Sequence, residues 1–165
     1  MIGNDVIDIL QSRLENNWQR KGFIEKLFTP EEQLLISNSE TPEIMVWTLW
    51  SMKEAAYKVY NRKTKIREYI PKKLVCTLEH QSLSHLQGKV TCLGNIYHTK
   101  TTVSRDIIHT VAVSVLDNLT KVKEVKKQSI LKDNNNIPFF VSSKNKIQDA
   151  SVSHHGRFEI CVTIL

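Results

Sequence analysis

Length, composition and charge place the chain among ordinary globular proteins. It has 165 residues, of which 41% are hydrophobic and 24% are charged, and its net charge is +6. These values exclude a collagen-like or wholly disordered chain and predict a single domain over residues 1–165 with its own core. The positive charge favours an anionic partner such as a nucleotide, a nucleic acid or an acidic protein, without choosing among them.

The first 40 residues predict one strand and two helices. Residues 2–10 are rich in β-branched and apolar side chains, which favours a strand. Residues 13–27 have the spacing of a helix, interrupted at Gly22. The next helix has a capping box at its start, Thr29 with Glu32, and ends near residue 36.

A longer helix is predicted over residues 42–63, with Thr41 as its N-cap. Its apolar residues lie on more than one face, which indicates a buried helix whose polar members need an explanation. After it, the β-rich runs 74–78, 89–93 and 107–116 are separated by turn-like glycines and predict an antiparallel meander.

The last third of the chain is less regular. The lysine-rich segment 118–136 predicts a weak helix followed by a loop, and residues 138–141 predict a short strand. Residues 150–165 predict a closing strand. Together these elements indicate an α+β fold.

Cysteine usage and hydropathy bear on the compartment. Cys76, Cys92 and Cys161 are widely spaced, which argues against a zinc ribbon or a disulfide scaffold and favours reduced thiols. No stretch approaches the roughly 18 apolar residues of a membrane span. The start, Met-Ile-Gly-Asn-Asp, carries an acid where a signal peptide carries bases. We therefore expect a cytoplasmic protein without a membrane partner.

Glu54 and Lys58 are the first candidates for chemistry. Their i, i+4 spacing places them on one helical face, one turn after Trp50. An ordinary intrahelical ion pair would explain them. However, a carboxylate among Trp and Ala side chains is costly unless a cation meets it, and a divalent metal is one such cation.

Asp5 and Asp8 are two acids on the first predicted strand. Their separation of three positions directs them to opposite faces, so only one of them can share a site with Glu54. An aspartate that caps the turn at the strand start is the alternative explanation.

The segment Ser151-Val152-Ser153-His154-His155-Gly156-Arg157 collects hydroxyls, imidazoles and a guanidinium that could bind a phosphate. A serine-hydrolase site is poorly supported because there is no nucleophile elbow. Adjacent histidines on a strand face opposite ways, which argues against a shared metal. A second Ser-x-Ser-His occurs at residues 82–85, so this short pattern alone is weak.

Taken together and in order, these motifs resemble the phosphopantetheinyl transferases, most closely the compact holo-acyl-carrier-protein synthase type. The resemblance covers residues 2–9, 26–63 and 150–165. The matching residues are Gly3, Asp5 and Ile9; Phe28, Thr29 and Glu32; Trp50, Lys53, Glu54, Ala55 and Lys58; and Ser151, Ser153 and His154.

The resemblance implies one α+β domain, with an antiparallel sheet packed against a long central helix and shorter helices. Because the chain is longer than compact members, residues 74–117 are expected to be a β-rich insertion. Compact members form trimers with shared active sites, so self-association is expected here, with a trimer as the candidate assembly.

The resemblance also implies a reaction, in which the phosphopantetheine arm of coenzyme A moves to a serine of an apo acyl carrier protein and adenosine 3',5'-bisphosphate is released. Asp5 and Glu54 would bind Mg²⁺, and Lys58 would steady the transferred phosphate. Asp5, Glu54 and Lys58 together form the expected catalytic set.

Four further residues are expected to contact coenzyme A. His154 and Ser153 would meet the phosphates of its adenosine end, and Lys26 would make a similar contact. Lys53 would support either the nucleotide or the fold. Carrier proteins of this kind are acidic, so lysine-rich runs near residues 62–67 or 121–127 could steer their approach.

Two alternatives stay open from the sequence. One is a small basic nucleic-acid-binding module, which would need aromatic residues interleaved with lysines on a sheet face. The other is a non-catalytic relative that binds a carrier protein, against which the presence of Asp5, Glu54 and Lys58 argues.

Overall fold

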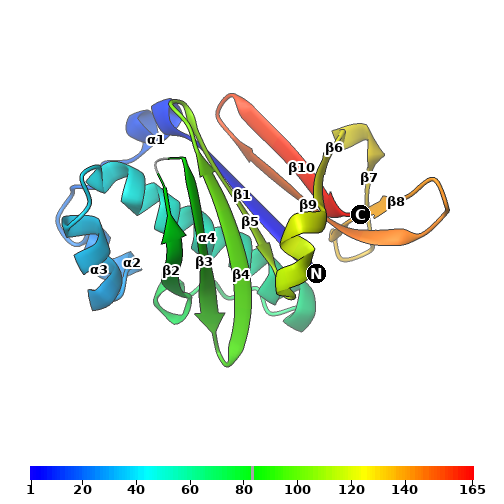
Figure 1. Ribbon diagram of the computed structural model, residues 1–165, viewed down its shortest axis with the longest axis horizontal. Helices are drawn as coiled ribbons and strands as arrows, with labels where there is room; N and C mark the ends of the chain where they lie inside the picture. The colour runs from blue at the N-terminus through cyan, green and yellow to red at the C-terminus, as the bar shows by residue number, and fades with distance from the viewer. Residues whose placement is uncertain (83) are drawn as a thin grey trace.

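Two antiparallel sheets and four α-helices make up the computed structural model, which describes residues 1–82 and 84–165. The two sheets lie side by side, and the helices gather around the first of them (Figure 1). The first sheet has the order β1-β5-β4-β3-β2. Its strands are β1 (Ile2–Asp8), β2 (Val75–Gln81), β3 (His85–Cys92), β4 (Asn95–Val103) and β5 (Ile107–Val113).

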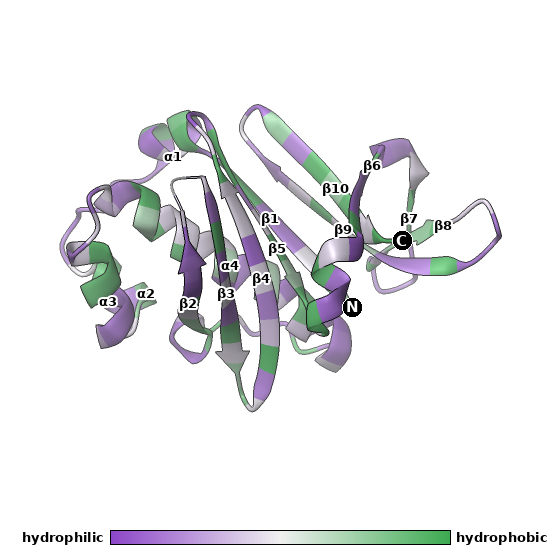
Figure 2. Cartoon of the chain, viewed as in Figure 1, coloured by the Kyte–Doolittle hydropathy of each residue, from purple (hydrophilic) through white to green (hydrophobic). Residues whose placement is uncertain are grey.

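The long helix α4 (Pro42–Thr64) confirms the predicted central helix and lies across one face of the first sheet (Figure 1). It packs chiefly against β1 and β5 and contributes a large share of the main core. More and less buried positions alternate along β3 and β4, as expected for strands whose one face is covered, and in β3 apolar residues fall at the buried positions (Figure 2).

The close approach of α4 to β1 requires a glycine. A Cβ at Gly3 would lie 2.1 Å from the main-chain oxygen of Ala55 and 3.0 Å from Cβ of Lys58. Any other residue would push α4 away from the strand that carries Asp5. Gly3 therefore sets the distance between the two elements.

Three short helices precede α4: α1 (Ile9–Glu15), α2 (Phe23–Leu27) and α3 (Pro30–Ser37). The single helix predicted over residues 13–27 is thus wrong, because α1 begins directly after β1 and a left-handed Gly22 begins α2. The capping box at the start of α3 is confirmed, with the Thr29 and Glu32 side chains each bonding the other's main-chain N–H.

The second sheet has the order β6-β10-β9-β8-β7. Its strands are β6 (Val122–Val125), β7 (Ile130–Lys132), β8 (Pro138–Val141), β9 (Ile147–His155) and β10 (Phe158–Ile164). The predicted strand 138–141 is confirmed. Residues 118–136 form short strands and 3-10 turns rather than a helix, and residues 150–165 form a hairpin that turns at the left-handed Gly156.

The segment 74–117, expected to be a β-rich insertion, forms most of the first sheet. It supplies β2 to β5, four of the five strands on which α4 packs, and β5 pairs directly with β1. Without it, α4 would keep β1 but lose the other four strands of this sheet.

A row of side chains joins the two sheets. β1 is an edge strand, and three N–H groups on its outer edge donate to side chains of β9, which runs parallel beside it. The bonds run from Asn4 N to Ser151 Oγ (2.9 Å), from Val6 N to Ser153 Oγ (3.0 Å) and from Asp8 N to His155 Nδ1 (2.9 Å). We call this row the seam.

Of the helices in the described part of the chain, none combines the length and the hydrophobicity that crossing a membrane requires.

The variant Gly3→Ala tests the close approach of α4 to β1. We expect it to lower the free energy of unfolding by about 1–3 kcal/mol, because the added methyl group overpacks the contact with Ala55. Urea denaturation measures this. Gly22→Ala is the control, since its Cβ meets nothing within 4 Å and only the positive φ of 81° opposes it. Equal losses in the two variants would contradict the role of Gly3.

Candidate active site

Two carboxylates from different elements face one cavity. Asp5 on β1 and Glu54 on α4 both line a cavity of about 170 Å³, together with Trp50 of α4 and His154 of β9. The fold therefore brings together both predicted metal ligands and one predicted phosphate-binding residue. We call this space the acid cavity.

Burial raises the pKa of both carboxyl groups in the acid cavity. Desolvation is the largest cause for Glu54, whose pKa rises to about 7, and the nearby charge of Asp5 adds to the effect. Desolvation also raises the pKa of Asp5, although Lys58 and the Ser153 hydroxyl partly offset it. Two acids that are this costly to ionise side by side favour a shared cation.

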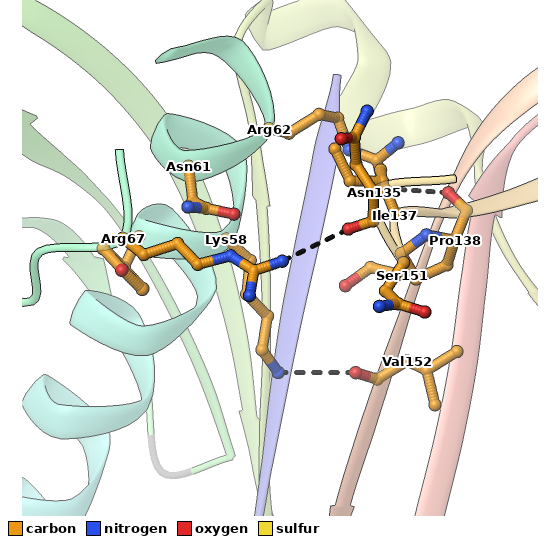
Figure 3. A pocket seen from close by; sticks show the side chains of 11 residues that line it. Lys58, Asn61, Arg62, Arg67, Asn135, Ile137, Pro138, Ser151 and Val152 are labelled. Carbon is orange, nitrogen blue, oxygen red and sulfur yellow. Dashed lines mark hydrogen bonds between the residues drawn. The ribbon is translucent and has the colours of Figure 1, made fainter. Parts of the chain in front are cut away.

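Lys58 stands beside Asp5 at the boundary of a second cavity. Its Nζ lies 3.7 Å from Asp5 Oδ1 and donates to the main-chain oxygens of Asn4 (2.6 Å) and Val152 (3.5 Å). The charge of Lys58 is thus held at the seam, where both sheets supply acceptors. Lys58 also lines a cavity of about 330 Å³, drawn in Figure 3, which we call the basic cavity.

The basic cavity lies between the C-terminal part of α4 and the segment that leads into β8 (Figure 3). Arg62 and Arg67 line it with Lys58. Arg62 bonds the Asp149 carboxylate (3.2 Å) and the main-chain oxygen of Pro138 (3.0 Å), and the Arg67 guanidinium bonds that of Asn135 (3.3 Å). Three cations around one hollow make it suited to an anion.

Ser153 and His154 differ in how they meet the site. His154 is exposed and borders the acid cavity, so an anion there can reach its ring. Ser153 is buried, and its Oγ accepts from Val6 N and donates to Asp5 Oδ1 at 3.1 Å. Only His154 is therefore free to contact a ligand directly.

Lys53 lies outside the site. Its side chain is completely buried, and Nζ donates to Glu32 Oε2 (2.8 Å), Pro71 O (2.8 Å) and Leu74 O (2.5 Å). Glu32 in turn accepts from Thr29 N in the capping box. An ammonium with three protein acceptors and no exposed surface favours the role in the fold over a contact with coenzyme A.

Lys26 is exposed and lines a third cavity of about 470 Å³, together with Arg20 and Lys21. This cavity shares Trp50 and an asparagine of the loop after α1 with the acid cavity, so the two are neighbours. A basic run just before Gly22 was the only sequence signal for Arg20 and Lys21.

Asp8 takes no part in the acid cavity, in agreement with the expected opposite faces. Its carboxylate caps α1 and forms a bidentate pair with Arg157, at 2.8 Å on both oxygens. The Arg157 guanidinium holds the pKa of Asp8 well below its usual range. Asp8 and Arg157 therefore close the β9–β10 hairpin onto β1.

The second Ser-x-Ser-His, residues 82–85, lies away from the site. Ser82, Ser84 and His85 are exposed at the connection between β2 and β3 and bond mainly one another. Leu83 lies outside the described residues.

Tyr69 is a site residue without any signal in the sequence. Its ring packs edge-on against Trp50 (5.7 Å between centroids) and Tyr57 (5.0 Å). Among the described residues, its buried hydroxyl makes no hydrogen bond of full geometry. Burial and the charge of Glu54 both raise the pKa of this hydroxyl. Only folding places it beside Glu54, because it comes from the loop after α4.

The residues of the acid cavity fit a magnesium ion that is bound by carboxylates of the protein and by a phosphate of the ligand. In the described ranges, no three His, Cys, Asp or Glu side chains converge as a metal-binding group. Asp5 and Glu54 supply two carboxylates, and Mg²⁺ is typically held by one or two carboxylates with phosphates and waters completing its octahedron. The raised pKa of both acids indicates that the protein alone does not balance their charge.

Comparison with known families agrees with this arrangement. A model of the 4'-phosphopantetheinyl transferase superfamily matches residues 1–115, which include β1, all four α-helices and the whole first sheet. No curated protein sequence matches the chain.

The α+β domain with an acidic pair between α4 and β1 is thus a group-transfer enzyme by its class. The chain belongs to the 4'-phosphopantetheinyl transferase superfamily. Membership assigns it a phosphopantetheinyl transferase activity in general. Enzymes of this superfamily use coenzyme A and Mg²⁺ and act on carrier proteins.

The variant Lys53→Met tests the role of this lysine in the fold. We expect the free energy of unfolding to fall by about 3–5 kcal/mol, because Glu32 would be left buried without its counter-charge. Chemical denaturation measures the loss, and Lys63→Met, an exposed lysine of the same helix, is the control. Unchanged stability with weakened coenzyme A binding would instead place Lys53 in the ligand site.

The variant Glu54→Gln tests the strained carboxyl of the acid cavity. A folded-state pKa of about 7 stands above the ordinary 4.5, so the cost of ionising Glu54 is fully present above pH 7 and disappears as the pH falls toward 4.5. We expect the variant to melt at a higher temperature than the wild type at pH 8 and at a similar temperature near pH 4.5.

Thermal melts between pH 4.5 and 8 without metal check this expectation, with Glu68→Gln, an exposed carboxyl, as control. Magnesium should raise the wild-type melting temperature at pH 8 and leave that of Glu54→Gln unchanged. A variant that is less stable than the wild type at pH 8 would contradict the proposed strain.

Proposed function

We propose that the protein is a holo-acyl-carrier-protein synthase, which moves the 4'-phosphopantetheine arm of coenzyme A onto a serine of an apo carrier protein and releases adenosine 3',5'-bisphosphate. The observation that carries this proposal is the pair Asp5 and Glu54 in one cavity with Lys58 beside it, 3.7 Å from Asp5. In this arrangement, acids that suit a metal and a cation that suits a phosphate meet between two cavities.

Asp5 and Glu54 would hold Mg²⁺. The ion, when bound, balances the charge of the pyrophosphate and of its developing transition state. The two carboxylates come from elements whose spacing Gly3 sets, so their separation is a property of the packing between α4 and β1. Their burial beside Trp50 limits competing water.

Lys58 would neutralise the transferred phosphoryl group. The serine oxygen of the carrier forms the new bond to phosphorus while the bond to the departing adenosine bisphosphate breaks, and the serine proton is released. Little covalent chemistry is needed from the protein, which suits a site of two acids, one lysine and no nucleophile. The main-chain acceptors around Nζ keep the charge at one point.

The basic cavity is the proposed place of the adenosine bisphosphate end of coenzyme A. Arg62 and Arg67 line it, and Lys58 connects it to the acid cavity. His154 on the acid side is the proposed phosphate contact of β9. The pyrophosphate would then pass over Lys58, with the pantetheine arm leaving through the acid cavity.

An acidic carrier protein is the proposed partner. Arg20, Lys21 and Lys26 form a positive border next to the acid cavity, where the serine must enter. This placement favours them over the run 121–127, where Lys127 already pairs with Glu159 at the exposed edge of the second sheet.

One chain supplies every group of the proposed site: Asp5 from β1, Glu54 and Lys58 from α4, and His154 from β9. We therefore propose that assembly of the site does not depend on the expected trimer. A cytoplasmic location is proposed from the three buried, unpaired cysteines.

The intact mass of an apo acyl carrier protein, incubated with coenzyme A and the protein, tests the function. We expect a gain of one phosphopantetheine arm with Mg²⁺ and none with EDTA. Asp5→Asn and Glu54→Gln should abolish the gain while keeping the fold, and Lys58→Ala should slow transfer by about 100-fold or more.

Binding of coenzyme A to Lys58→Ala should change less than the rate. Full transfer by Asp5→Asn or Glu54→Gln would refute the metal assignment. The absence of transfer to every carrier by the wild type, with coenzyme A still bound, would favour a non-catalytic relative.

A further inference from the structure

The seam contains two serines in equivalent positions with different surroundings. Ser151 and Ser153 each accept an N–H from β1, at 2.9 Å and 3.0 Å, and both are nearly completely buried. Ser153 alone also donates to a carboxylate, Asp5 Oδ1, at 3.1 Å. A comparison of the two serines can therefore distinguish an effect on the contact between the sheets from an effect on Asp5.

The Ser153 hydroxyl has its hydrogen-bonding capacity in use. It has one proton, which is directed to Asp5, while a lone pair accepts from Val6 N. Its residue is 5% exposed. A phosphate would need that proton, so Ser153 can bind one only by releasing Asp5.

These bonds orient the Asp5 carboxylate. Oδ1 accepts from Ser153 and faces Lys58 Nζ at 3.7 Å, whereas Oδ2 receives no hydrogen bond of full geometry from the residues described. The neighbouring Ser51 hydroxyl bonds the main-chain oxygen of Asp5 instead, at 3.4 Å. One carboxylate oxygen is thus anchored in the protein, and the other remains available for a ligand.

We propose that Ser153 is a positioning residue, which acts through Asp5 and prepares it to bind the metal, and that it does not contact coenzyme A. This inference rests on the proposed function, because it concerns the same metal site. Residues that orient metal ligands typically change metal affinity by 10–100-fold when they are removed.

Ser153→Ala and Ser151→Ala are the matched test, made in the full chain. Each variant loses one seam bond, and Ser153→Ala also loses the bond to Asp5 Oδ1, so thermal melts check that both variants remain folded. The probe is Mn²⁺ in place of Mg²⁺, titrated without carrier or coenzyme A and followed by the electron paramagnetic resonance signal of the free ion. We expect Ser153→Ala to bind Mn²⁺ at least about tenfold more weakly than the wild type, and Ser151→Ala to stay within about twofold.

Ser153→Thr keeps the hydroxyl and should restore most of the affinity. Equal Mn²⁺ affinities for both alanine variants would overturn the proposal, as would a Ser153→Ala variant that loses coenzyme A affinity but keeps Mn²⁺ affinity. The Mn²⁺ titration does not involve transfer. A wild type that binds Mn²⁺ but modifies no carrier would therefore refute the proposed function. The role of Ser153 would still be decided by the Mn²⁺ affinities of the two alanine variants.

Discussion

The packing of α4 against β1 is the constraint on which the site depends. Gly3 allows the main chains to approach so closely that a single Cβ would collide with Ala55. At this distance Glu54 and Asp5 share one cavity, and burial raises the pKa of both. The fold thus keeps two acids in a costly arrangement, which is a common property of sites that bind a charged ligand.

Neighbouring residues of α4 have opposite roles for a geometric reason. Consecutive positions on a helix are about 100° apart, so Lys53 points toward Glu32 and the start of β2 while Glu54 points toward β1. The Lys53–Glu32 pair joins α4 to α3. A conspicuous lysine next to a proposed metal ligand therefore stabilises the framework of the protein.

The seam solves the problem of an exposed sheet edge. β1 would otherwise present unpaired N–H groups next to the site, and side chains of Ser151, Ser153 and His155 satisfy them without a regular ladder. Because side chains rather than main-chain bonds join β1 to β9, the main-chain oxygens of Asn4 and Val152 stay free of a regular ladder. Lys58 reaches both oxygens from between the sheets. The second sheet is in this way part of the site.

The sequence by itself determined the local features, namely the capped α3, the buried α4 and the strand β1, because capping residues and side-chain periodicity act over a few positions. Periodicity also placed Asp5 and Asp8 on opposite faces, while the choice of Asp5 came from the resemblance to the family. The sequence did not determine that residues 74–117 are the main sheet, that Lys53 is internal, or that Tyr69 meets Glu54. Those facts depend on which distant elements pack together. Only the tertiary structure showed that Ser153 serves Asp5, since a serine in a sequence does not disclose whether its one proton is already committed to a neighbour.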